Sequence, residues 1–202
     1  MKLYYSPTSP FVRKVNVFAK EVGLDKQIEW IKTNPWQVED KLTAVNPLSQ
    51  IPTLVTDNGE IIFDSNVICE YLDTLHENKK LIPDVGDKRW NALGLQALAN
   101  GILESGISRF LERKRPAELQ SSDWDKTQQK SIQRALNELE RSVKDWGEDN
   151  NIATISIAIT LGWLDFRFAE EDWRPEHKHL AQWFSVYSQR DSMLSTMPAE
   201  AS

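Results

Sequence analysis

Residues 53–63 read Thr53-Leu54-Val55-Thr56-Asp57-Asn58-Gly59-Glu60-Ile61-Ile62-Phe63. Asn-Gly between two apolar runs is the strongest short-range signal for a β-hairpin, because both residues accept the positive φ angles of a tight turn. Asp64 and Ser65 follow directly and precede apolar residues at helical spacing, so either one can cap the start of a helix. The stretch therefore predicts two antiparallel strands followed by a helix.

The residues before this hairpin alternate between strand and helix signals. Strand-like runs at residues 3–5 and 28–31 enclose residues 10–22, whose apolar positions recur at helical spacing. A short helix over residues 38–44 is expected to end before Pro47, because the residue preceding a proline avoids the helical region. The order is β-α-β-α-β-β-α, with a right-handed crossover between the first two strands. It predicts a mixed sheet of about four strands.

Beyond Lys88 the strand signals disappear and helical patterns take over. One helix is expected from Trp90 towards Arg115, a second over residues 132–143, and a third over residues 152–168. The third is nearly all apolar and therefore central, and Pro175 is expected to open a further helix. The fold class is thus α+β with two domains. The predicted ranges are an α/β domain over residues 1–78, a linker over residues 79–87 and an all-helical domain over residues 88–202.

Composition and charge narrow the classes of function. The 202 residues include 30 Asp and Glu against 24 Lys and Arg, a formal net charge of −6, which argues against a general electrostatic grip on nucleic acid or an anionic membrane. No run approaches the ~18–20 apolar residues of a membrane span, and the first residues lack a secretory signal. The single cysteine, Cys69, forms no internal disulfide. We expect a cytoplasmic protein without a nucleic-acid, membrane or metal partner.

Three segments together resemble the cytosolic glutathione S-transferases. They are Leu3–Val15, with Ser9-Pro10; Asn46–Leu54, with Ile51-Pro52; and Phe63–Leu72, with Asp64-Ser65. The resemblance covers the whole chain in order and spacing, and it is to bacterial, serine-type members with a theta- or tau-like opening motif. It implies a thioredoxin-like N-terminal domain, a helical C-terminal domain, glutathione bound mostly by the first domain, and a homodimer.

Ser9 is the candidate for thiol activation. A free thiol titrates near pH 8.5, and the thiolate is the nucleophile. A hydroxyl that donates a hydrogen bond to sulfur at a helix N-terminus favours the thiolate, and Ser9 stands directly before Pro10, where the first helix is expected to start. The alternative is a simple helix cap. Tyr5, at the end of the first strand, is the runner-up, with Thr8 as a further rival; Tyr5 is otherwise a half-buried packing residue.

The resemblance also implies the residues that bind glutathione: Phe11, Gln50, Ile51, Pro52, Asp64 and Ser65. Pro52 is implied to be cis and to present the backbone of Ile51 to the cysteinyl part of glutathione. Ser65 and the helix-start N–H groups can hold a carboxylate, and Asp64 can accept from the ligand's ammonium. The alternative is that Asp64 and Ser65 are an ordinary N-cap pair. Trp36 and Phe110 are candidates for the electrophile pocket.

Two positions depart from the pattern of the family. Gln50 stands where many relatives have lysine, which removes a positive charge from the presumed site. The central C-terminal helix of the family usually opens Ser/Thr-x-x-Asp, a capping pair, and here the matching residues are Asn151 and Thr154. A cap remains possible, without its carboxylate.

Three functions are compatible with these residues. The first is a detoxifying glutathione transferase, which activates glutathione and conjugates it to an electrophile. The second is a weakly catalytic or non-catalytic protein of the same fold that binds ligands or regulates a partner. The third is glutathione-dependent reduction of peroxides or disulfides. Pro10 and Phe11 stand where relatives that form mixed disulfides carry cysteine, so chemistry by a protein cysteine is not expected. The electrophile pocket has no motif, and no particular electrophile is predicted.

Overall fold

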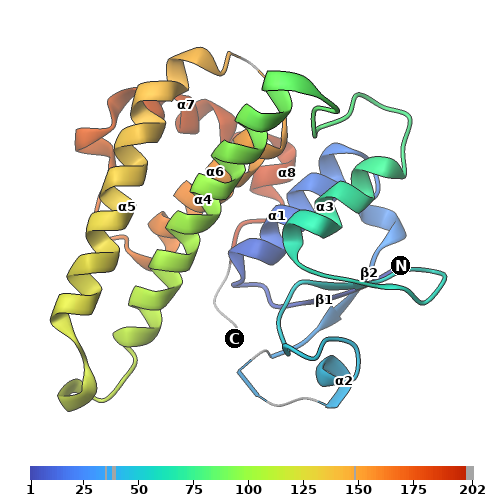
Figure 1. The fold of residues 1–202 in the computed structure, drawn as a ribbon, viewed down its shortest axis with the longest axis horizontal. Helices are drawn as coiled ribbons and strands as arrows, with labels where there is room; N and C mark the ends of the chain where they lie inside the picture. Colours follow the sequence, from blue (N-terminus) through green and yellow to red (C-terminus); the bar gives the residue numbers. More distant parts are fainter. Residues whose placement is uncertain (35, 38–39, 148, 199–202) are drawn as a thin grey trace. The chain divides into compact units, whose positions relative to one another are not determined.

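The strands of the N-terminal half form one mixed sheet in the order β2-β1-β3-β4. The structure is a computed structural model that describes residues 1–34, 36–37, 40–147 and 149–198 (Figure 1). The strands are β1 (Lys2–Tyr5), β2 (Glu29–Lys32), β3 (Thr53–Val55) and β4 (Ile61–Ile62). β1 pairs parallel with β2 and antiparallel with β3, which places Leu3 opposite both Trp30 and Leu54. β3 and β4 form the antiparallel hairpin. The predicted sheet is confirmed.

Two helices pack against each other and fill the core of this half. α1 (Pro10–Glu21) links the parallel strands and ends before Gly23, whose φ of +77° suits a glycine. α3 (Ser65–Thr74) follows the hairpin, and Phe18 of α1 and Ile68 of α3 are fully buried. A short helix, α2, spans Asp40–Thr43, and a 3₁₀ turn, η1, spans Asp25–Gln27. The first two residues of the helix predicted over 38–44 lie outside the described residues.

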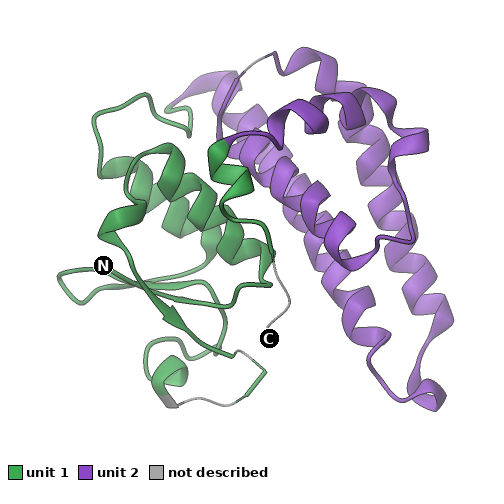
Figure 2. Cartoon of the chain, turned by 180° about the vertical axis from the view of Figure 1, so that it is seen from behind, with its two compact units in different colours: residues 1–84, 191–202 green, residues 85–190 purple. Residues whose placement is uncertain are grey.

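The chain divides into two compact units (Figure 2). The boundary falls between Asp84 and Val85, inside the segment predicted as a linker. Residues from Asp191 onward, expected in the helical domain, group with the N-terminal unit instead, where the short helix α8 (Asp191–Leu194) contacts α1. Arg13 contributes to this return, because its buried guanidinium donates a 3.0 Å hydrogen bond from Nη2 to the carbonyl of Met193.

The second unit is helical, and its central helix is α6. Its members are α4 (Gly86–Glu112), α5 (Ser122–Ser142), α6 (Ile152–Arg167) and α7 (Lys178–Tyr187), with the 3₁₀ turns η2 (Ala117–Leu119), η3 (Val143–Asp145) and η4 (Arg174–Glu176). Every residue of 152–161 is buried, and α4 packs along α6. At the contact, a Cβ built on Gly106 would lie 2.6 Å from Cζ3 of Trp163. Within the described residues, no helix is long and apolar enough to cross a membrane.

The predicted start of α7 is wrong by three residues. Pro175 lies in the 3₁₀ turn η4, and α7 begins only at Lys178, because His177 has non-helical angles (φ −133°, ψ 63°). His177 offers no side-chain cap; Glu140 of α5 does so instead, accepting hydrogen bonds from the backbone N–H groups of His179 (3.1 Å) and Leu180 (2.8 Å). The start of α7 is therefore set by a neighbouring helix.

The start of α6 carries a complete capping box. The side-chain Oδ1 of Asn151 accepts hydrogen bonds from the backbone N–H groups of Ala153 (2.9 Å) and Thr154 (3.3 Å). In return, Oγ1 of Thr154 accepts from the backbone N–H of Asn151 at 3.0 Å. A threonine hydroxyl thus performs the reciprocal task for which the family usually uses a carboxylate, and this departure leaves the helix fully capped.

Candidate functional site

Ser9 is the N-cap of α1, at the turn that follows β1. Its extended backbone (φ −78°, ψ 121°) suits a cap, and its Oγ accepts a hydrogen bond from the backbone N–H of Val12 at 3.3 Å. The cap alternative for Ser9 is therefore confirmed. It does not exclude the functional role, because the cap uses a lone pair of the hydroxyl, which still carries its own hydrogen for donation.

The two rival hydroxyls of the same turn have other surroundings. The ring of Tyr5 is half-buried and packs edge-on against Trp30, with ring centroids 5.7 Å apart and an interplanar angle of 87°. Oγ1 of Thr8 lies 3.3 Å from Oγ of Ser6. Ser9 alone among the three hydroxyls is placed at the helix N-terminus by its own backbone.

The loop before β3 holds Gln50, Ile51 and Pro52 in a defined conformation. The Ile51–Pro52 peptide bond is cis, as the resemblance implies. The carbonyl of Gln50 accepts hydrogen bonds from Nδ2 of Asn46 (3.1 Å) and from Oγ1 of Thr53 (2.8 Å), and Nδ2 of Asn46 also donates to Oγ1 of Thr53 (2.9 Å). Asn46 and Thr53 are 1% and 0% exposed, so a buried polar network fixes this loop. The side chain of Gln50 is exposed.

Sequence reasoning assigned no role to Asn46 and Thr53. The signal available for Asn46 was its position before Pro47, because asparagine side chains commonly accept from the backbone two residues on. In the structure, Oδ1 of Asn46 accepts from the backbone N–H of Leu48 at 2.9 Å. Because Oδ1 of Asn46 is used in this turn, its Nδ2 is the atom that donates to the carbonyl of Gln50.

Asp64 and Ser65 form the start of α3. Asp64 is exposed and is the N-cap: its Oδ1 accepts from the backbone N–H groups of Asn66 (2.8 Å) and Val67 (3.4 Å). Ser65 is the first helical residue and is 2% exposed. The N-cap alternative is confirmed for Asp64, while contact of either residue with a ligand stays a prediction. Ten residues of helix add a partial positive charge at this end, which favours an anion.

Lys14 is a buried cation that the sequence analysis did not single out. It is 1% exposed, and its Nζ donates to Oδ1 of Asn66 at 2.8 Å. The position follows from spacing, because Pro10, Lys14 and Phe18 lie four residues apart and therefore share the buried face of α1. Periodicity alone could have found this lysine.

The two residues predicted for the electrophile pocket belong to different units. Trp36, in the N-terminal unit, is 68% exposed. Phe110, in the helical unit, is half-buried, and its ring is approached by Nζ of Lys114 (4.2 Å to the centroid) and the guanidinium of Arg167 (4.6 Å). Two cations on this ring make its environment less apolar than an aromatic residue alone suggests. The pocket role of both residues stays a prediction.

Cys69 is a structural residue. It is fully buried in α3, and burial raises the pKa of its thiol to about 12, with Asp64, Asp73 and Glu70 acting in the same direction and Lys14 opposing them. A thiol with so high a pKa is a poor nucleophile at neutral pH. Across the described ranges, no group of three or more His, Cys, Asp or Glu residues is arranged to hold a metal ion.

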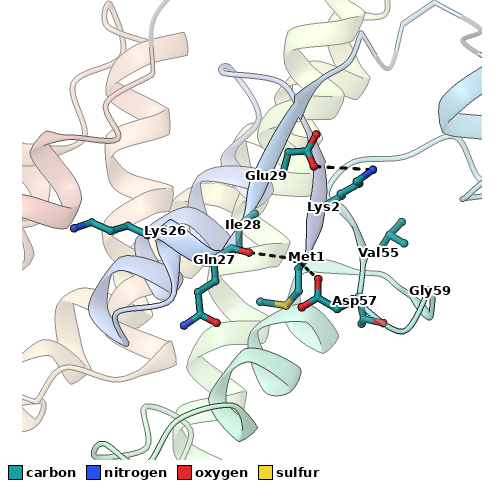
Figure 3. Close-up of a pocket in the computed structure, with 10 residues that line it drawn as sticks. Met1, Lys2, Lys26, Gln27, Ile28, Glu29, Val55, Asp57 and Gly59 are labelled. Atoms are coloured by element: carbon teal, nitrogen blue, oxygen red, sulfur yellow. Dashed lines mark hydrogen bonds and ion pairs between the residues drawn. The ribbon is translucent and has the colours of Figure 1, made fainter.

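A pocket of about 550 Å³ lies at the start of β1, at the opposite end of this strand from the turn that leads to Ser9 (Figure 3). It surrounds the first residues of β1, where the Met1 ammonium contacts Oδ1 of Asp57 at 2.6 Å and the carbonyl of Gln27 at 3.2 Å. Ser9 lies four residues beyond Tyr5, the last residue of β1, so this pocket at the start of β1 is separate from the candidate site. It contains none of the predicted site residues.

Comparisons with known proteins agree on one family. A sequence model of the family described as "Glutathione S-transferase, N-terminal domain" matches residues 8–75. An Escherichia coli (strain K12) protein described as "Uncharacterized GST-like protein YibF" is 34% identical over 204 residues, covering 100% of both chains. A glutathione transferase family member from Pseudomonas fluorescens Pf-5, solved with bound glutathione, is 39% identical with a TM-score of 0.95, covering 98% of each chain. A second structure from that strain, with bound S-(propanoic acid)-glutathione, is 38% identical with a TM-score of 0.90, covering 98% of this chain and 99% of the other.

Proposed function

Because the chain belongs to the glutathione S-transferase family, we propose that it binds glutathione, activates its thiol as the thiolate and conjugates it to an electrophilic small molecule. Glutathione is a substrate in this scheme, and no metal takes part. The S-substituted glutathione in the Pseudomonas relative supports conjugation, because its ligand carries a substituent on sulfur.

The observation that carries this proposal is the geometry of Ser9. Its Oγ accepts from the backbone N–H of Val12 at 3.3 Å, so its own O–H is available to a sulfur placed beside the turn. The N-terminus of α1 adds a partial positive charge at the same point. Lowering the thiol pKa by two units requires about 2.7 kcal/mol in favour of the anion. Ser9 acts as a hydrogen-bond donor and not as the nucleophile.

The remaining site residues orient glutathione. The backbone of Ile51, set by the cis bond to Pro52 and by the Asn46–Thr53 network, faces the cysteinyl part of the ligand. Asp64 and Ser65 at the start of α3 hold its ammonium and carboxylate. Phe11 and the side chain of Gln50 complete the proposed glutathione contacts, and Trp36 and Phe110 are assigned to the electrophile.

Three further parts of the proposal concern the whole molecule. Residues 1–78 act as the glutathione-binding domain, residues 79–87 as a linker, and residues 88–202, whose short helix α8 groups with the N-terminal unit, supply the electrophile surface. The protein works in the cytoplasm as a homodimer, and sedimentation at micromolar concentration should give twice the mass of the single chain. A species of single-chain mass would contradict the dimer.

Retention on immobilised glutathione, together with turnover of an aryl halide by the retained protein, tests the catalytic function. Retention with turnover supports the transferase. Retention without turnover of aryl halides, peroxides or disulfides would replace it with the binding protein of the same fold. Turnover limited to peroxides or disulfides would replace conjugation with reduction. Failure to bind glutathione in solution, measured by calorimetry, would refute the proposal as a whole.

A further inference from the structure

Lys14 brings a cationic side chain into the interior of the N-terminal unit, beside the start of α3. Only 1% of the residue is exposed, and lysine is almost never so buried unless its ammonium finds partners. Its Nζ donates to Oδ1 of Asn66 at 2.8 Å and lies 5.6 Å from the centroid of the Phe11 ring. An amide oxygen and an aromatic face both favour a charged amine. These two partners hold the charge at the helix start.

Hydrogen bonds connect Lys14 to the predicted ligand residues. Because Oδ1 of Asn66 accepts from Lys14, Nδ2 of Asn66 faces Asp64 and donates to its Oδ2 at 3.4 Å. Oδ1 of Asp64 accepts from the backbone N–H of Asn66 at 2.8 Å. Asn66 thus donates to both oxygens of the Asp64 carboxylate, of which Oδ1 also accepts from the backbone N–H of Val67, and the side chain of Asn66 is itself bonded to Lys14.

The positive charge of Lys14 acts electrostatically on Cys69, a residue in the middle of α3. It is the group that lowers the pKa of the Cys69 thiol, against burial and against the carboxylates of Asp64, Asp73 and Glu70. Charges buried in a protein are screened less by salt than exposed ones. The field of Lys14 therefore adds to the helix dipole at the point where an anion would bind.

We propose that Lys14 is a specificity-determining residue, whose buried positive charge favours ligands with a carboxylate at the γ-glutamyl end. The inference rests on the proposed function, because it concerns glutathione at the start of α3. Lys14 attracts that carboxylate from the protein interior, next to Asn66 in the first turn of α3.

The test compares two ligands that differ in one carboxylate. Glutathione carries the α-carboxylate and the ammonium, while 4-aminobutanoyl-cysteinylglycine keeps the ammonium and lacks that carboxylate. Calorimetry should show that Lys14→Met weakens glutathione binding about tenfold, equal to about 1.4 kcal/mol. The same substitution should change binding of 4-aminobutanoyl-cysteinylglycine by less than twofold, because this ligand keeps the glycine carboxylate but lacks the carboxylate at the γ-glutamyl end, on which Lys14 is proposed to act.

Two more variants separate charge from structure. Lys14→Gln keeps a donor for Oδ1 of Asn66 but removes the charge, so it should lose affinity for glutathione as Lys14→Met does; it also serves if Lys14→Met does not fold. Lys20→Met is the matched control: it removes an α1 lysine that pairs with Asp25 at 3.5 Å, outside the proposed site, and glutathione binding should stay within twofold. Melting temperatures without ligand show that each variant is folded.

The following results would overturn the role proposed for Lys14. If Lys14→Met weakens both ligands equally, Lys14 has a structural role and the inference is wrong while the proposed function stands. Wild-type affinity for glutathione in Lys14→Gln would mean that the hydrogen bond, not the charge, is what counts, and it would also overturn the inference. If the wild-type protein binds neither ligand, the proposed function fails first, and the inference fails with it.

Discussion

Replacing Ser9 by alanine should affect two properties of the protein that can be measured separately. The hydroxyl caps α1 through its 3.3 Å bond from the Val12 N–H, and loss of such a cap costs about 0.5–2 kcal/mol of stability. The same hydroxyl is proposed to donate to the glutathione thiolate. A hydrogen bond to a charged group is worth about 1.5–3 kcal/mol, which corresponds to a rate roughly ten- to over a hundredfold lower when thiolate attack is limiting.

Ser121 offers a matched control for the cap alone. It is the N-cap of α5, where its Oγ accepts from the backbone N–H of Trp124 at 3.2 Å, and it has no place in the proposed site. Ser121→Ala should lower stability to a similar degree and leave turnover unchanged. Ser9→Thr keeps a hydroxyl that can serve both purposes and should retain most of the activity.

The assay combines urea unfolding with a pH–rate profile for an aryl halide. In Ser9→Ala, the apparent pKa of bound glutathione should rise towards that of the free thiol, while glutathione affinity stays within a few-fold. Tyr5→Phe should change the rate much less, because the Tyr5 ring packs against Trp30. The reasoning is refuted if Ser9→Ala loses stability as Ser121→Ala does but keeps the wild-type rate and pH profile. Loss of activity in Tyr5→Phe alone would reverse the assignment of the hydroxyl.

Three further predictions concern packing, reactivity and pH. Gly106→Ala should lower the free energy of unfolding, measured in urea, by about 1–3 kcal/mol, because the new Cβ would lie 2.6 Å from the Trp163 ring. Gly101 lies in the same helix with open space around it, so Gly101→Ala should raise the free energy of unfolding by up to ~1 kcal/mol. Equal stability of the two variants would contradict the packing argument. Cys69 should resist alkylation in the native protein at neutral pH, since burial raises its thiol pKa to about 12, and modification before unfolding, seen by mass spectrometry, would show that the site opens. Burial raises the pKa of Glu171, but hydrogen bonds from Arg109 and Arg113 outweigh burial and hold this pKa below its usual value. The contribution of Glu171 to stability is therefore present above its pKa in the unfolded chain, and it is lost as the pH falls through its lower pKa in the folded protein. Glu171→Gln should flatten the decline of unfolding free energy in acid, and an unchanged slope would show that Glu171 does not contribute to that decline.

The sequence predicted the N-terminal unit well because its signals are local. Asn58-Gly59 marks the turn of the hairpin, where Gly59 takes a positive φ of 81°, and Pro10 and Gly23 mark the limits of α1. The cap alternatives for Ser9 and for the Asp64-Ser65 pair depend on equally local signals, and the structure makes Ser9 and Asp64 the N-caps. Each of these inferences depends on residues only a few positions apart.

The features that the sequence did not predict depend on distant residues. The start of α7 is set by Glu140 of another helix. The return of residues from Asp191 to the N-terminal unit depends on Arg13 and a backbone carbonyl, and a carbonyl leaves no trace in a sequence. In the candidate site, helix caps and ligand-binding positions both use short polar side chains such as those of Ser9 and Asp64. The sequence therefore could not decide between the two roles for these residues.

The bond between Arg13 and the carbonyl of Met193 has a consequence for protein synthesis. Its partners are 180 residues apart, and at a translation rate of about 5–20 residues per second the second is made roughly 10–40 seconds after the first. The helical unit, whose residues 85–190 are contiguous, is translated in that interval. The unit whose synthesis starts before the helical unit is thus completed after it, and the guanidinium of Arg13 gains this acceptor only once Met193 has been translated.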